Sequence, residues 1–300
     1  MRAVLGLLAL AALLAAATPV GAAGTVSIVT AENFYGDVAR QIGGDHVNVT
    51  SILSNPDQDP HLFEASPSAA RAISAARIVV CNGAGYDPWM ARLLETTKAP
   101  DRGTIVVAEL VGRKPGDNPH IWYDPATMRA FASALTMGLS SVDPAHQAGY
   151  LRNLTRFEQS MQPIQARITA LRTRLAGIPV TATEPIFGYM FEALGMRVRN
   201  LPFQIAVMNN TEPGASQVAA FESDLKTHQV RLLVYNSQAS DPIANRMRKL
   251  AEASGIPTVA VTETEPADTT YQAWMQSELE AIDRAVPQDA SGRGSPKAIR

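Results

Sequence analysis

Cysteine is almost absent from this chain. Its 300 residues include a single cysteine, Cys81, in the apolar stretch "RIVVCNGAG". One thiol cannot form an internal disulfide, and without a C-x-x-C pair there is neither a cysteine zinc site nor a dithiol redox motif. Because Cys81 closes an apolar run, we expect a small buried side chain there. No cysteine lies near the N-terminus, so we do not expect a lipid anchor.

An excess of charge is also missing. The 26 basic and 28 acidic residues give a formal net charge of -2, and no basic stripe is present. This excludes nucleic acid as an expected partner. The hydrophobic share of 46% against 18% charged residues is typical of a globular protein. The motifs H-E-x-x-H and G-x-S-x-G are absent too, which argues against two common classes of hydrolase.

A long apolar run occurs only at the N-terminus. Arg2 is followed by an apolar segment from Val4 to Ala17, then by Pro19 and small residues. This pattern predicts a cleaved signal peptide over residues 1–23 and export to the periplasm. The apolar core is short for a membrane span, which needs roughly 20 residues.

The remaining chain alternates between strand-like and helix-like segments. Strand patterns occur in two groups of four: "TVSIVTA", "HVNVTSIL", "RIVVCNG" and "TIVVAEL", then "IPVTAT", "VRNLPFQ", "RLLVYNS" and "IPTVAVT". Strands separated by helices predict parallel βαβ units. We therefore expect an α/β protein with two parallel-sheet domains and a binding cleft between them.

One segment between the two groups has no strand candidate. Residues 143–176 carry apolar residues at helical spacing, with Asp143 before Pro144 as a helix start and Pro163 as a position for a kink. A helix of ~30 residues spans ~45 Å, enough to connect two domains. We predict an N-terminal α/β lobe (24–142), a connecting helix (143–176), a C-terminal α/β lobe (177–286) and a disordered tail (287–300).

Four polar residues each follow a predicted strand: His61, His120, Glu184 and Glu263. Ligands bind at the carboxyl ends of strands in open α/β sheets. Two residues come from each half, so a cleft between the lobes would bring them together. Imidazole suits Zn, Fe and Mn, whereas carboxylate favours harder ions such as Mn(II). Two carboxylates also offset the charge of a buried divalent ion.

Simpler interpretations exist for these residue types. A single histidine in a loop is more often structural, and we interpret His46, His146 and His228 as surface residues. Glu184 alone could be a carboxylate at a helix N-terminus, stabilised by the helix dipole. The surroundings of His120 in "DNPHIWYDP" do not by themselves decide between a packed core residue, a catalytic base and a metal ligand.

A family resemblance bears on this choice. It is carried by five stretches, in this order: "NPDQDPHLFEASPS", "DNPHIWYDP", "TATEPIFGYMFEALGM", "NNTEPGAS" and "VAVTETEP". Together they resemble the periplasmic zinc- and manganese-binding solute-binding proteins of ABC importers (the ZnuA-like, TroA-like group), over nearly the whole mature chain.

The resemblance implies a set of metal ligands. His61 and His120 would be the ligands of the N-terminal lobe. The third ligand, histidine in typical zinc members and glutamate in some manganese members, would be Glu184. The fourth is usually an aspartate, but "VTETEP" offers only Glu263 and Glu265. We favour Glu263, which comes first after the strand, over Glu265 and the more distant Asp268.

The resemblance also implies a function. The chain would be a monomeric solute-binding protein, not an enzyme, that captures one divalent metal and delivers it to the permease of an ABC transporter. The ligand set and the absence of a long His-rich loop slightly favour Mn or Fe over Zn, although Zn(II) would also bind tightly. The alternatives are a metal-dependent hydrolase, for which Glu265 would be the spare base, and a periplasmic metal chaperone or adhesin.

Overall fold

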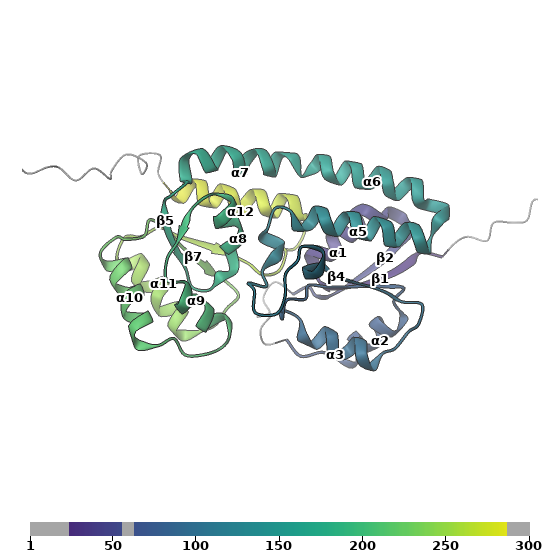
Figure 1. Ribbon diagram of the computed structural model, residues 1–300, viewed down its shortest axis with the longest axis horizontal. Coiled ribbons are helices and arrows are strands. Elements are labelled where there is room, and N and C mark those ends of the chain that lie inside the picture. Colours follow the sequence, from purple (N-terminus) through teal and green to yellow (C-terminus); the bar gives the residue numbers. More distant parts are fainter. Residues whose placement is uncertain (1–23, 56–62, 287–300) are drawn as a thin grey trace, which may run out of the picture.

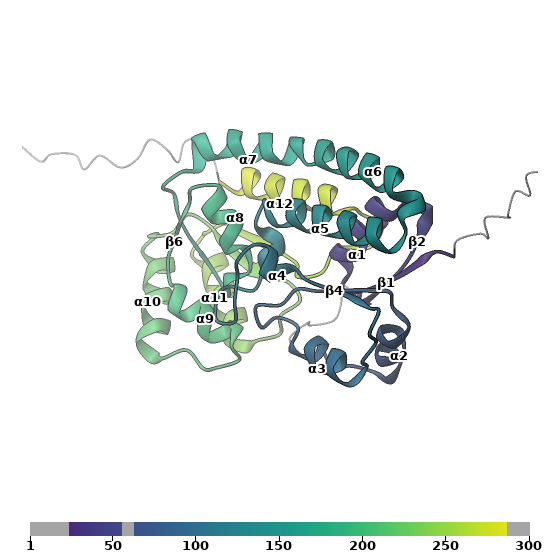
Figure 2. The ribbon, with the colours of Figure 1, turned by 45° about the vertical axis from the view of Figure 1, so that its right-hand side comes forward.

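The computed structural model describes residues 24–55 and 63–286. The predicted signal peptide, the predicted tail and His61 lie outside the described residues. The chain forms two α/β lobes side by side, each built on a four-stranded sheet, with a row of helices along one side of both (Figures 1 and 2). The predicted fold class is therefore confirmed.

The N-terminal sheet has the strand order β2-β1-β3-β4, and all of its pairings are parallel. Its strands are β1 (Val26–Glu32), β2 (Val47–Leu53), β3 (Ile78–Cys81) and β4 (Gly103–Val106). Its helices are α1 (Asn33–Gly43), α2 (Pro67–Ala75), α3 (Pro88–Thr96), α4 (Val107–Leu110) and α5 (Thr127–Val142). Cys81 is buried, as its apolar surroundings predict.

The C-terminal sheet repeats this arrangement with the order β6-β5-β7-β8, again parallel. Its strands are β5 (Pro179–Ala182), β6 (Arg197–Val198), β7 (Leu233–Asn236) and β8 (Thr258–Val261). Its helices are α8 (Gly188–Ala193), α9 (Leu201–Met208), α10 (Ala215–Lys226), α11 (Pro242–Ala253) and α12 (Tyr271–Ala285).

The predicted strand "VRNLPFQ" is wrong for most of its length. Within this segment only Val198 pairs with β5, as the second residue of β6, and α9 begins at Leu201. Asn200 turns the chain with a φ of 60°, and Pro202 lies in the first turn of the helix. Proline lacks the N–H that a paired strand needs, whereas the first turn of a helix leaves that group unused.

The connecting segment is two helices end to end. α6 (Gln147–Ser160) and α7 (Gln162–Leu175) are separated only by Met161, and Pro163 stands in the first turn of α7. The pair runs along both lobes (Figure 1). α7 lies beside α12, where Arg174 donates a 2.6 Å hydrogen bond to the Val286 carbonyl and pairs with Asp283. The exact domain boundaries remain predictions.

The two lobes share one hydrophobic core. Trp122 packs on Phe34 with ring centroids 4.8 Å apart, and Tyr123 packs on Phe187 of the C-terminal lobe at 4.9 Å. The Tyr271 hydroxyl of α12 donates a 2.7 Å hydrogen bond to the Trp122 carbonyl. A continuous core resists large relative movement of the lobes.

Among the described residues, no helix is both long and apolar enough to cross a membrane.

Candidate metal centre

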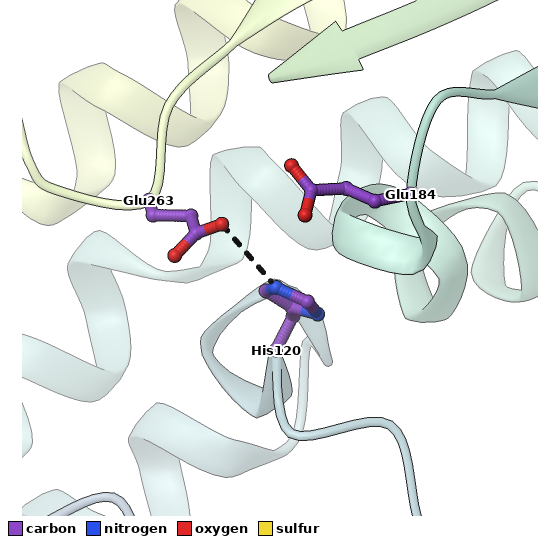
Figure 3. A group of neighbouring side chains, drawn as sticks. All are labelled: His120, Glu184 and Glu263. Carbon is purple, nitrogen blue, oxygen red and sulfur yellow. Dashed lines mark ion pairs between the residues drawn. The ribbon is translucent and has the colours of Figure 1, made fainter. Parts of the chain in front are cut away.

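Three of the four predicted residues meet between the lobes: His120, Glu184 and Glu263 (Figure 3). Each offers one ligand atom, and these atoms all lie within 4.8 Å of one another. His120 Nε2 is 3.5 Å from Glu263 Oε1, and both side chains are fully buried. Glu184 is only 2% exposed. His61 lies outside the described residues, so its place relative to this group stays a prediction.

Strand ends and short turns position these three side chains. Glu184 follows β5 and precedes the short 3₁₀ helix η5 (Pro185–Phe187). Glu263 lies just after β8, and His120 immediately precedes the 3₁₀ helix η3 (Ile121–Tyr123). The two glutamates thus occupy the carboxyl edge of the C-terminal sheet, where α/β proteins bind ligands.

The two alternatives for the fourth ligand lie elsewhere. Glu265 is absent from the group, and its backbone N–H and C=O are both hydrogen-bonded to the side chain of Asn33. Burial, and then the charge of Asp37, raises the pKa of Glu265 to about 9. At neutral pH this carboxyl is protonated, which makes it a poor ligand and a poor general base. Asp268 is exposed.

Glu263 is held by partners from both lobes. The Tyr86 hydroxyl donates to Oε2 and the Asn236 side-chain amide donates to Oε1, each at 2.7 Å. The backbone N–H of Glu263 donates to Gln238 Oε1 at 2.6 Å. Burial, followed by the charge of Glu263, raises the pKa of Tyr86, so its hydroxyl keeps the proton that it donates. These bonds orient the carboxylate and leave its position little freedom.

His120 is equally well oriented. Its Nδ1 is 2.7 Å from the side-chain oxygen of Asn118, and its ring lies edge-on to Trp122 with centroids 5.3 Å apart. Within the described part of the chain, Nε2 has no hydrogen-bond partner. An imidazole bonded through one nitrogen, with the other aimed at carboxylates, is the usual arrangement of a metal ligand.

The electrostatics of this centre favour a cation. Two glutamates are enclosed at one point between the lobes. Burying two carboxylates close together is costly, and a divalent cation would offset their charge. Imidazole nitrogen and carboxylate oxygen together suit first-row transition metals.

Four supporting residues were not predicted from the sequence: Tyr86, Asn118, Asn236 and Gln238. A signal was available for two of them. Asn236 is the last residue of β7, and Tyr86 lies in the loop after β3. Both therefore lie near the carboxyl end of a strand, as the predicted ligands do. Their pairing with Glu263 depends on how the lobes dock, which no local pattern contains.

Comparison with known proteins identifies the family of this chain. A family profile described as "Zinc-uptake complex component A periplasmic" matches residues 28–285. The chain belongs to this family. Its members are periplasmic metal-binding, solute-binding components of ABC metal import and not enzymes.

Individual relatives differ in the metal that their names record. The chain is 22% identical over 272 residues to the manganese-binding lipoprotein MntA of Bacillus subtilis, covering 83% of this chain and 86% of that protein. It is 24% identical over 252 residues to the iron-binding protein YfeA of Yersinia pestis, and the match covers 79% of this chain and 78% of YfeA. The solved structure of the periplasmic zinc-binding protein TroA of Treponema pallidum has the same fold, with a TM-score of 0.73 and 18% identity. The match covers 87% of this chain and 99% of TroA.

Proposed function

We propose that this protein captures one divalent transition-metal ion between its lobes and delivers it to the membrane permease of an ABC importer. His120, Glu184 and Glu263 would bind the ion, with His61 as the fourth ligand predicted from sequence. The observation that carries this proposal is the convergence of three buried ligand atoms within 4.8 Å. The protein would act as a monomer in the periplasm after removal of its signal peptide.

Manganese or iron is the favoured cargo, by a small margin over zinc. With the predicted ligand His61, the set would be two imidazoles and two carboxylates. It is harder than the set of typical zinc members, which have a third imidazole in place of Glu184. Relatives named for manganese and for iron support this preference. Zinc-binding relatives are similar as well, and the Irving–Williams order places Zn(II) above Mn(II) for most such sites.

Release of the ion would come from a local movement. The lobes share a hydrophobic core, and helices α5, α6, α7 and α12 brace them along one side (Figure 2). Wide opening would expose much of this core to water. We expect one ligand-bearing loop of the C-terminal lobe, carrying either Glu184 or Glu263, to move away from the ion instead.

Metal analysis tests the proposal. Protein purified from the periplasmic fraction should carry about one transition-metal equivalent, and titration of metal-free protein should give one tight site for Mn(II) or Zn(II). His120→Ala should remove that site. His228→Asn is the matched control, because His228 is exposed and has a positive φ that asparagine tolerates. Full metal content in His120→Ala would show that the proposed site is wrong.

A further inference from the structure

Asn118 connects the metal centre to the opposite lobe. Its side-chain oxygen accepts hydrogen bonds from both the ring Nδ1 (2.7 Å) and the backbone N–H (3.2 Å) of His120. Its side-chain nitrogen donates a 2.7 Å bond to the carbonyl of Pro185, the residue after Glu184. Its own carbonyl accepts a 2.7 Å bond from the Tyr189 hydroxyl. One asparagine therefore contacts a candidate ligand in one lobe and the neighbour of another ligand across the interface.

These contacts fix which atom of the amide faces which partner. A backbone carbonyl can only accept, so Pro185 requires the NH₂ end of the Asn118 amide. The oxygen end must then face His120, and Nδ1 must carry the proton of that hydrogen bond. In the neutral ring this leaves the lone pair on Nε2. Nε2 is the nitrogen that points at the carboxylate of Glu263.

A glycine makes room for this link. A Cβ atom added to Gly188 would lie 2.9 Å from the side-chain nitrogen of Asn118, closer than real Cβ contacts. Any larger residue at position 188 would therefore push the amide away from Pro185. Gly188, Asn118 and Tyr189 also line a cavity of about 600 Å³ between the lobes. Water in that cavity would compete for the amide once the link is broken.

We infer that Asn118 is a positioning residue through which the docking of the C-terminal lobe sets the tautomer of His120. Pro185 orients the amide, the amide orients the imidazole, and Nε2 is presented only while the lobes are docked at this point. Without the Asn118–Pro185 bond the amide can turn and present its NH₂ end to His120. The proton is then no longer held on Nδ1, and the hold of Nε2 on the ion weakens. This inference rests on the proposed role of His120 as a ligand.

The test compares four variants with the wild type by Mn(II) affinity, by the rate of Mn(II) release and by the ¹⁵N spectrum of His120 in metal-free protein at mildly alkaline pH. A fifth variant, His120→Ala, is compared by affinity alone. Asn118→Ala and Gly188→Ala should weaken Mn(II) binding by about 10–100-fold, the usual effect of losing an outer-shell partner. Both should also lose the pure Nδ1–H spectrum of the wild type. Asn118→Asp should keep that spectrum, because a carboxylate still accepts from Nδ1, yet release Mn(II) faster, because it cannot donate to Pro185.

Asn153→Ala is the matched control, because Asn153 also donates a side-chain bond to a carbonyl, that of Ile42, but away from the metal centre. It should change neither the affinity nor the spectrum. Wild-type affinity and an unchanged spectrum in both Asn118→Ala and Gly188→Ala would overturn the inference, while His120→Ala would still lose the ion. If His120→Ala keeps full affinity, the proposed site itself is wrong and the inference falls with it.

Discussion

His120 Nε2 lies 3.5 Å from Glu263 Oε1, and the two side chains come from opposite lobes. Two ligands that each lie about 2 Å from a tetrahedral metal are about 3.3 Å apart. The observed separation is close to that value and longer than a good hydrogen bond. The lobes are therefore already docked at the spacing that an ion between them requires.

Removing the charge of Glu263 should reduce metal affinity sharply. Glu263→Gln keeps the size of the side chain but removes one of the two carboxylates, so we expect at least a hundredfold weaker Mn(II) binding by competition titration. Glu265→Gln is the control, because the raised pKa of about 9 already keeps that group neutral at pH 7. Equal losses in the two variants would show that Glu263 has no special role.

The hydroxyl of Tyr86 should contribute to affinity without touching the ion. Tyr86→Phe removes the 2.7 Å hydrogen bond to Glu263 Oε2 and leaves the ring in place. Outer-shell partners of this kind contribute about 10–100-fold to metal affinity, so a loss within that range is expected. Tyr150→Phe, which loses a bond to Asp143 instead, should bind metal normally. Unchanged affinity in Tyr86→Phe would mean that Asn236 alone orients the carboxylate.

Glu184 should influence which metal is preferred. Glu184→His replaces a hard oxygen ligand by an imidazole and removes a negative charge, which favours Zn(II) over Mn(II). We expect the ratio of Zn(II) to Mn(II) affinity to rise at least tenfold, with the stoichiometry unchanged. Parallel titrations with both ions measure this ratio. If the ratio does not move, Glu184 is not a ligand.

Glu278 should make stability depend on pH. Its carboxylate accepts a 3.1 Å hydrogen bond from Trp274 Nε1, and burial raises its pKa from 4.5 to about 8. Between these values the unfolded chain has lost the proton that the native state still holds, so native stability falls as pH rises from about 4.5 to about 8. Glu278→Gln should remove this loss of stability, because glutamine has no proton to release in this pH range.

Thermal unfolding across that pH range checks the prediction. The Tm advantage of Glu278→Gln over the wild type should grow as pH rises to about 8 and then level off. Curves of Tm against pH that run parallel for the two proteins would exclude Glu278 as the source of the dependence.

Much of the fold could be predicted because its signals are local. The alternation of strands and helices fixed the α/β class, and the carboxyl ends of strands gave Glu184 and Glu263. The error at "VRNLPFQ" arose because apolar residues suggested a strand while Pro202 at a helix start decided the outcome. The role of Asn118, by contrast, depends on contacts with His120, 2 positions away, and with Pro185, 67 positions away. Pro185 reaches Asn118 only because the two lobes dock.

Anomalous X-ray diffraction from crystals grown with Mn(II), and separately with Zn(II), tests the central claim most directly. We predict one strong peak between the lobes, about 2 Å from His120 Nε2 and from carboxylate oxygens of Glu184 and Glu263. A peak that lies elsewhere, or one without His120 among its ligands, would contradict the proposed metal centre.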